Sequence, residues 1–310
     1  MLATLLALLL PLPGWAAQPR SPGGAAPVLG FAAQTRVEAE TPGHTLYEVR
    51  FPSSRPSRFP ANNTVWGHLY VPKTPRPDGA LPPCILVLPI MAAPNSWVEQ
   101  RFVDTFVARG FAAMWLEMPY QFHRRPHPSI PSGQVFLART SRRLGDNFRQ
   151  SIADARRALD WLKGSRLVDG SRLGLFGISL GGIVAAAVYT ADPSPKGAVL
   201  LLAGADFPSL LFASSMTSAF VRGAGIDPEE LRRTWKDIDP AGRREDNRGK
   251  PVLLINARWD SVVPKANALR LKEAFPEARQ VWVPFGHYSA ILHLFWVRSY
   301  AAREFSRLLR

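Results

Sequence analysis

The sequence predicts an α/β fold, with a mostly parallel central sheet flanked by helices and with lid insertions after two of the strands. From about residue 41 of the 310-residue chain, short apolar segments alternate with amphipathic segments of helical period. Hydrophobic residues make up 46% of the chain and charged residues 20%, which is typical of a globular protein. Because strands that alternate with helices need right-handed crossovers, we expect a mostly parallel sheet.

The N-terminal residues precede this pattern and resemble an export signal. Residues 2–12 are almost wholly apolar, and Pro11 and Pro13 end a run that is too short to span a bilayer. We expect residues 1–17 to be a signal peptide and 18–40 a Pro/Gly/Ala-rich linker, with a periplasmic or secreted mature protein that has no membrane span. No Lys or Arg precedes the run, which leaves open an uncleaved anchor or a different start. Without a signal the protein would be cytoplasmic.

Eight segments of the domain at 41–310 have the length and composition of strands. The first two are expected to pair antiparallel, and the third is a continuous apolar run typical of a strand buried on both faces. The predicted strands are residues 45–51, 65–71, 84–88, 111–116, 172–176, 198–203, 252–255 and 280–283. The single cysteine, Cys84, begins the third strand and is expected to be a small core side chain. One cysteine excludes an internal disulfide.

Helices are expected between these strands. Ser96 and Glu99 have the spacing of a capping box, and Asp227 before Pro228 is a typical helix start. The predicted helices are residues 96–110, 146–163, 180–189, 265–275 and a last helix from 288. Two insertions, at 118–145 and 206–249, follow the carboxyl ends of strands, which is the functional edge of an open α/β sheet.

The segment Gly177-Ile-Ser-Leu-Gly-Gly182 carries the chemistry. It follows an apolar strand and opens an apolar helix, where a nucleophile elbow would lie. Such a turn exposes Ser179 at a helix N-terminus, and glycines are needed where side chains would collide with the helix or the next strand. The alternative is a glycine-rich packing turn with an incidental serine.

A serine nucleophile needs a base, and the base needs an orienting acid. Two histidines follow Ser179 in the chain: His287 on a loop after a strand, and His293 within an amphipathic segment where a packing role is expected. His287 is therefore the predicted base. Asp260 follows the strand at 252–255 and is the predicted acid, with Asp206 after the preceding strand as its competitor.

With Asp260-Ser-Val-Val-Pro264 and Gly286-His-Tyr288 in this order after the serine motif, the chain resembles the α/β-hydrolase superfamily over nearly everything after residue 41. Within the superfamily it is similar to the dienelactone-hydrolase-like and prolyl-oligopeptidase-like branches. The resemblance implies that the amide of Leu180 binds the oxyanion. Many relatives have His-Gly after the third strand where this chain has Pro89-Ile90, so the second amide must come from Met91 or Ile90; by position we favour Met91.

With Ser179 as nucleophile, His287 as base and Asp260 as acid, the sequence predicts a serine hydrolase that cleaves small carboxylic esters through an acyl-enzyme and needs no cofactor. A peptidase or amidase with the same triad is the first alternative. An inactive binding protein that keeps the fold is the second.

The charge suggests something about the substrate. Lys and Arg number 38 against 24 Asp and Glu, a net charge of +14, but no nucleic-acid motif accompanies it. Five arginines lie in the insertion at 118–145, namely Arg124, Arg125, Arg139, Arg142 and Arg143. If they bind substrate, with Arg124 and Arg125 as the named contacts, the substrate is an anionic or lipid ester; the alternative is that these arginines serve only solubility. His123 and His127 lie on the same Pro-rich loop with arginines between them, and no metal site is expected there.

Overall fold

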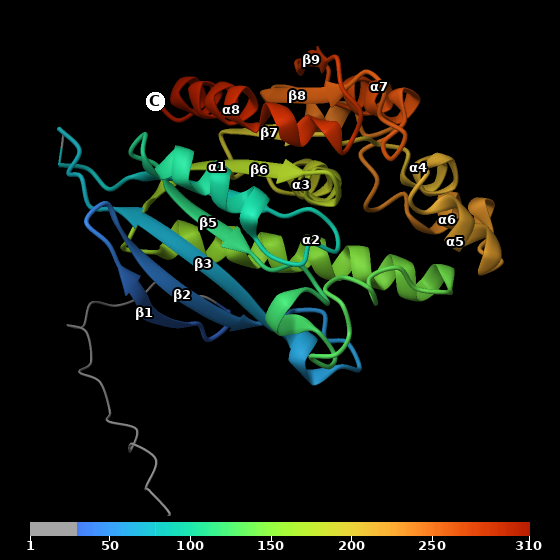
Figure 1. Cartoon of the computed structure of the whole chain (residues 1–310), viewed down its shortest axis with the longest axis horizontal. Helices are drawn as coiled ribbons and strands as arrows, with labels where there is room; N and C mark the ends of the chain where they lie inside the picture. The colour runs from blue at the N-terminus through green and yellow to red at the C-terminus, as the bar shows by residue number, and fades with distance from the viewer. Residues whose placement is uncertain (1–29, 78) are drawn as a thin grey trace, which may run out of the picture.

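The computed structural model describes residues 30–77 and 79–310, and within them nine strands form one sheet (Figure 1). The first strands pair antiparallel up to the β3–β5 pair, and all later pairs are parallel. In spatial order the strands are β1 (Gln34–Glu40), β2 (His44–Pro52), β3 (Thr64–Pro72), β5 (Ala112–Leu116), β4 (Pro83–Leu88), β6 (Asp169–Ile178), β7 (Gly197–Leu201), β8 (Val252–Ala257) and β9 (Arg279–Val283). The predicted mostly parallel α/β fold is confirmed.

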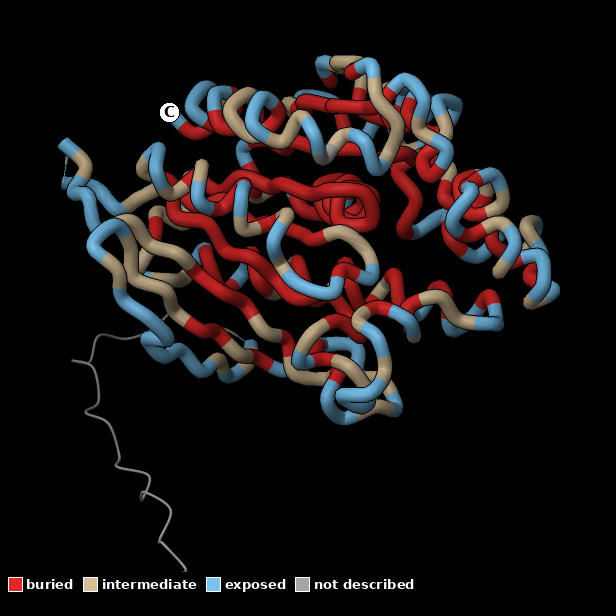
Figure 2. Tube along the Cα trace, in the orientation of Figure 1, coloured by how far each residue is buried: buried red, intermediate tan, exposed pale blue. Residues whose placement is uncertain are grey.

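Helices cover both faces of this sheet. α1 (Trp97–Val107) and α8 (Leu294–Leu308) cover one face, and α2 (Ser141–Gly164), α3 (Leu180–Ala191) and α7 (Lys265–Ala274) cover the other (Figure 1). Side chains of β4 alternate between the two layers: Cys84, Leu86 and Leu88 pack on the α2 and α3 side, and Ile85 and Val87 on the α1 and α8 side. Figure 2 shows the central strands and α3 buried along almost their whole length.

The edge strand β1 corrects the expected linker. The sequence predicted a linker through residue 40, but Gln34–Glu40 pairs antiparallel with β2. All seven side chains of β1 are exposed, and only Val37 and Ala39 are apolar, so the segment is too polar to stand out as a buried strand. It is held by the ladder to β2 and by an ion pair in which Arg36 meets Glu48 at 2.7 Å. The predicted signal peptide, and the linker up to residue 29, lie outside the described residues.

One helix start has other side-chain contacts than expected, and another lies earlier in the chain. Ser96 is the N-cap residue of α1, as predicted. The Ser96 side chain makes no capping hydrogen bond, and Glu99 instead accepts one from the Ile90 amide at 2.9 Å. The capping-box prediction is therefore wrong, because the buried carboxylate is used by the loop after β4. α2 begins at Ser141, five residues earlier than expected, with Thr140 accepting from the Arg143 amide.

The two insertions have different content. Residues 206–249 contain α4 (Phe207–Ala213), α5 (Ser218–Gly223), α6 (Pro228–Thr234) and the 3-10 turn η3 (Glu245–Asn247), and Asp227 caps α6 as expected. Residues 118–140 are turns around η2 (Phe122–Arg124). The other 3-10 turns of the described residues are η1 (Pro60–Asn63) and η4 (Ser289–His293). Among the helices of the described residues, none is both long and apolar enough to cross a bilayer.

Candidate active site

Ser179 lies on the sharp turn between β6 and α3. Its backbone angles are φ 53° and ψ −117°, a strained conformation for a residue with a side chain. The turn presses against β4: a Cβ added to Gly181 would lie 2.2 Å from the Leu88 carbonyl oxygen, and one added to Gly177 would lie 2.3 Å from the Gly181 carbonyl oxygen. The glycines of the motif are therefore required by close backbone contact, and the turn presents the Ser179 hydroxyl at the start of α3.

His287 and Asp260 lie on loops after β9 and β8, at the same sheet edge as Ser179. The Ser179 Oγ and His287 Nε2 are 2.9 Å apart, and His287 Nδ1 lies 2.8 Å from Asp260 Oδ2. The other oxygen of Asp260 accepts hydrogen bonds from the amides of Val262 and Val263. Because β6, β8 and β9 are parallel strands of one sheet, their carboxyl ends bring three residues from distant parts of the chain together.

The competing candidates lie elsewhere. Asp206 begins α4, where its carboxylate accepts from the Ser209 amide. His293 ends η4 and stacks on Phe285, with ring centroids 3.5 Å apart. Neither contacts the Ser179 hydroxyl through a described hydrogen bond, so His293 has the packing role expected for it.

Side chains hold the backbone on both sides of the Ile90 Cα. The Ile90 amide, in the peptide from Pro89, donates to Glu99 at 2.9 Å, and the Ile90 carbonyl, in the peptide to Met91, accepts from the Gln121 side chain at 2.8 Å. In a trans peptide the carbonyl and the following amide point in opposite directions, so the Met91 amide points away from Gln121. Met91 also lines the pocket beside Ser179. The Leu180 amide, in the first turn of α3, has no acceptor within its own helix. Sequence reasoning missed Gln121, because nothing local marks it.

A cavity of about 160 Å³ opens beside Ser179. Apart from Ser179 and His287 its lining is apolar, with Tyr288 contributing a phenol ring: Ile90, Met91, Val98, Phe102, Ile178, Leu201, Leu202, Met216, Ile255, Val283, Tyr288, Ala290, Leu294 and Val297. Because this lining is apolar, the pocket suits an apolar group. Tyr288, which lines the pocket, is 68% exposed, and Phe295 in α8 is 75% exposed.

The predicted substrate contacts of Arg124 and Arg125 are wrong. Arg124 is fully buried and donates to Asp154 at 2.6 Å and to the carbonyl oxygens of Asn62 and Glu117. Arg125 donates to the Phe122 and Pro128 carbonyl oxygens of its own loop. Neither side chain lines the cavity beside Ser179. Arg124 is therefore bound by Asn62 and Asp154, which are distant in sequence, and Arg125 is bound by carbonyl oxygens of its own loop.

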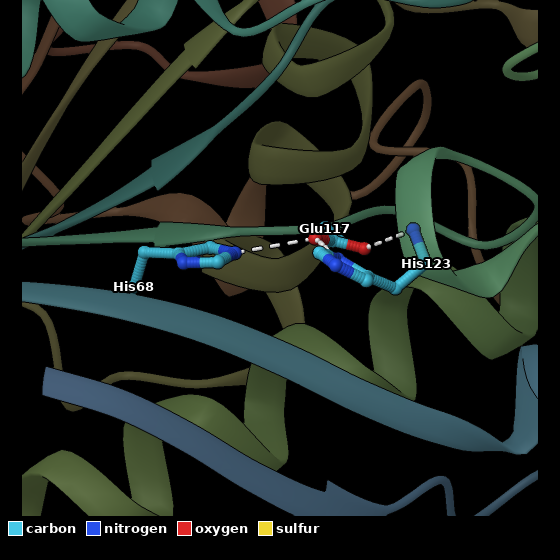
Figure 3. Close-up of side chains that lie close together, drawn as sticks. All are labelled: His68, Glu117 and His123. Carbon is cyan, nitrogen blue, oxygen red and sulfur yellow. Dashed lines mark hydrogen bonds and ion pairs between the residues drawn. The ribbon is translucent and has the colours of Figure 1, made fainter. Parts of the chain in front are cut away.

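A second polar cluster was missed. His68 on β3, Glu117 after β5 and His123 in η2 lie together, as Figure 3 shows, whereas His127 is exposed and contacts Ser129. The sequence placed His123 beside His127 because they are four residues apart. Only the antiparallel pairing of β3 with β5 brings His68 to Glu117.

A serine on a strand-to-helix turn, bonded to a histidine and an aspartate on later loops of a mostly parallel sheet, defines the α/β-hydrolase class of proteins. The profile of the Prolyl oligopeptidase family matches residues 129–309, more than half of the chain. The chain belongs to this family, and the protein is an α/β-hydrolase.

Comparisons with individual proteins agree with this class. The alpha/beta hydrolase domain-containing protein WAV2 of Arabidopsis thaliana is 30% identical over 152 residues, which are 46% of this chain and 47% of that protein. The match thus spans about half of this relative. Among solved structures, an acetyl xylan esterase from Paenibacillus sp. R4 has a TM-score of 0.61 at 18% identity over 87% of this chain and 88% of its own. The Pyrococcus horikoshii acylaminoacyl peptidase has a TM-score of 0.65 at 15% identity over 87% of this chain and 42% of its own.

Proposed function

We propose that the protein is a serine esterase that cleaves small carboxylic esters with an apolar acyl group. The observation that carries this proposal is the hydrogen-bonded chain from Ser179 through His287 to Asp260, at 2.9 and 2.8 Å, beside an apolar pocket. The side chains of His287 and Asp260 are 8% and 2% exposed, so water competes little for the hydrogen bond between them.

The geometry suits two-step acyl transfer. The Ser179 oxygen attacks the acyl carbon while its proton passes to His287 Nε2, and the tetrahedral intermediate then expels the alcohol, which takes that proton. Water next attacks the acyl-enzyme, gives its proton to His287, and the acid leaves as the proton returns to Ser179. Asp260 accepts from His287 Nδ1 throughout, which holds the imidazole with Nε2 facing the serine and stabilises its cationic form.

Two backbone amides would stabilise the negative oxygen of the intermediate. The Leu180 amide directly follows the nucleophile, and we assign the second position to the Met91 amide. The Ile90 amide already donates to Glu99 and is not free for the oxyanion. Gln121 donates to the Ile90 carbonyl, and this fixes the Met91 amide of the same peptide in the opposite direction. Amides held rigidly before substrate binds cost no reorganisation when charge develops.

The pocket favours an apolar, uncharged acyl group. An apolar cavity of about 150 Å³ is large enough for benzene, so a cavity of 160 Å³ has room for a short alkyl or an aryl group. A peptide would need hydrogen bonds to its backbone, and the lining of this cavity is mainly aliphatic and aromatic. Amide cleavage uses the same catalytic groups, so an amidase is the alternative that a matched ester and amide pair tests.

A fluorophosphonate probe tests the proposal directly, because only an activated serine reacts with it at neutral pH. We expect labelling of the wild type at Ser179 and loss of labelling in Ser179→Ala and His287→Ala. A folded wild type that stays unlabelled and cleaves no ester would contradict the proposal and favour a binding protein. Labelling with amide cleavage faster than ester cleavage would favour the amidase.

Export is a separate part of the proposal, and it is supported by the apolar residues 2–12 alone. Mass spectrometry of the N-terminus of the natively produced protein tests it. We expect an N-terminus at or near residue 18. An intact residue 1, or residue 2 after removal of the methionine, would contradict cleavage.

A further inference from the structure

We propose that His68, Glu117 and His123 bind a zinc ion, at a site outside the lining of the Ser179 cavity. Each offers one ligand atom, and these atoms all lie within 4.8 Å of one another. Glu117 Oε1 lies between the two rings, 3.2 Å from His68 Nε2 and 2.7 Å from His123 Nδ1 (Figure 3). Two imidazoles and one carboxylate are a donor set that zinc prefers.

The spacing is close to that of a zinc site. With bonds of about 2.0–2.2 Å, ligand atoms of a tetrahedral zinc lie roughly 3.3 Å apart. The His68–Glu117 separation already meets this value, and the His123–Glu117 separation would open by about half an ångström. The two histidine nitrogens lie within 4.8 Å of each other and would move closer together. His123 lies on a 3-10 turn with 56% of its side chain exposed, so it can make this small movement. The same exposure leaves the fourth position to water.

The surroundings fix the ligand atoms. His68 stacks on Trp115 and His123 on Trp66, with ring centroids 4.7 and 4.2 Å apart, which restricts the orientation of both rings. The far nitrogen of His68 lies 3.4 Å from a Glu38 oxygen. A carboxylate behind a histidine ligand holds the ring in the tautomer that leaves its other nitrogen free to bind metal.

Charge also favours a divalent cation here. Glu117 and Glu38 supply two negative charges against two from the ion. Arg50 lies over the Trp66 ring at 3.6 Å and is the nearby cation, but it is paired with Glu48 at 2.6 Å. Glu117 is 1% exposed, and without an ion its carboxylate is stabilised by the two imidazole rings and by the His123 backbone amide, which donates to Oε2 at 3.0 Å.

Bound zinc would join three elements. His68 belongs to β3, Glu117 follows β5, and His123 lies in the insertion at 118–145. The ion would therefore fasten the insertion to the antiparallel part of the sheet, and it would stabilise the folded protein in proportion to its binding.

Calorimetric titration of the full-length, chelator-treated protein with zinc chloride tests the site. We expect one equivalent to bind the wild type and to raise its melting temperature. His123→Gln and Glu117→Gln should each weaken binding by about 10- to 100-fold or more. The matched control is His127→Gln, an exposed histidine on the same loop, which should bind as the wild type does. His287→Gln should also keep binding, which separates this site from the active site.

Binding that survives in His123→Gln, or a wild type that takes up no zinc at one equivalent, would overturn the proposal and leave Glu117 as a hydrogen-bonded bridge between two histidines. His123 lies at the surface, so this variant decides the question even where Glu117→Gln fails to fold. Ester hydrolysis is not part of the readout, so the outcome is independent of the proposed function.

Discussion

The two oxygens of the Asp260 carboxylate have separate partners. One accepts from the Val262 and Val263 amides and holds the carboxylate in place, and the other faces His287 Nδ1. Because two backbone amides fix one carboxylate oxygen, the other oxygen keeps its position toward His287 although Asp260 lies on a loop.

Asp260→Asn should lower kcat by on the order of 10⁴-fold, because an amide can hold the imidazole in the wrong tautomer and cannot stabilise its cation. Steady-state hydrolysis of an activated ester measures this. The control is Asp206→Asn, which should keep wild-type kcat because Asp206 caps α4. The reverse pattern would move the acid to Asp206.

In the proposed function, Gln121 is a positioning residue that acts through the Ile90–Met91 peptide. Gln121→Leu removes the hydrogen bond to the Ile90 carbonyl, so the Met91 amide is no longer held toward the pocket. We expect kcat to fall on the order of tenfold or more, with little change in KM, because the amide acts in the transition state. Gln134→Leu, an exposed change in the same insertion, is the control. A rise in KM with unchanged kcat would contradict this role.

At the scale of elements, a buried ion pair joins η2 to α2. Arg124 is 0% exposed and Asp154 1% exposed, and their atoms are 2.6 Å apart. Asp154 also accepts from the Ser53 hydroxyl after β2. The pair thus anchors the insertion at 118–145 to α2.

Asp154→Ala should destabilise the fold by about 3–5 kcal/mol, because it leaves the Arg124 guanidinium buried without its carboxylate. Urea unfolding followed by circular dichroism measures the change. Arg142→Ala, an exposed arginine of the same region, should stay within about 0.5 kcal/mol of the wild type. Equal effects of the two changes would argue against the anchoring role.

The insertion at 206–249 depends on Asp239, whose buried carboxylate accepts from the amides of Asp206, Phe207 and Ala241. Burial outweighs these hydrogen bonds and raises the pKa of Asp239 from 3.8 to about 6. The folded state then binds a proton more tightly than the unfolded state. Unfolding between about pH 4 and pH 6 therefore releases protons, so this group's contribution to stability falls as pH rises through that window.

Free energies of unfolding from pH 4 to pH 7 check this for the wild type and Asp239→Asn. The difference, wild type minus variant, should fall by about 2 kcal/mol between pH 4 and pH 6 and level off by pH 7. The variant serves as its own control for all other titrating groups. A difference that stays constant with pH, or rises, would contradict the raised pKa.

At the scale of the whole molecule, the net charge of +14 does not reach the active-site cavity. In the described part of the chain, the cavity beside Ser179 has no Arg or Lys in its lining. Arg124 and Arg125 instead bind carbonyl oxygens and Asp154 within the protein. The sequence-based expectation of an anionic substrate therefore loses these two arginines, and Arg139, Arg142 and Arg143 line a different pocket.

A panel of esters with one alcohol and different acyl groups tests this consequence. Each added methylene that the cavity buries contributes about 0.8 kcal/mol, so kcat/KM should rise about fourfold from acetate to propionate and again to butyrate. A succinate monoester should be a poorer substrate than butyrate. Preference for the charged acyl group would contradict an apolar acyl site and restore the anionic substrate.

The sequence by itself determined the features that depend on local pattern. Buried parallel strands are continuous apolar runs, so strands such as 84–88 and 252–255 could be found without any partner. Ser179 was evident because its turn needs glycines next to it in the chain. His287 and Asp260 followed because residues after parallel strands meet at one edge of the sheet.

Only the tertiary structure decided the features that depend on partners distant in the chain. The exposed strand β1 exists through its ladder to β2, not through its own composition. Arg124 is buried because Asp154, 30 residues away, lies opposite it. His68 and Glu117 meet because β3 pairs with β5, and the Glu99 carboxylate accepts from the Ile90 amide of a loop distant from its own helix start. A polar side chain takes the partner that the fold brings to it, and its neighbours in sequence do not reveal that partner.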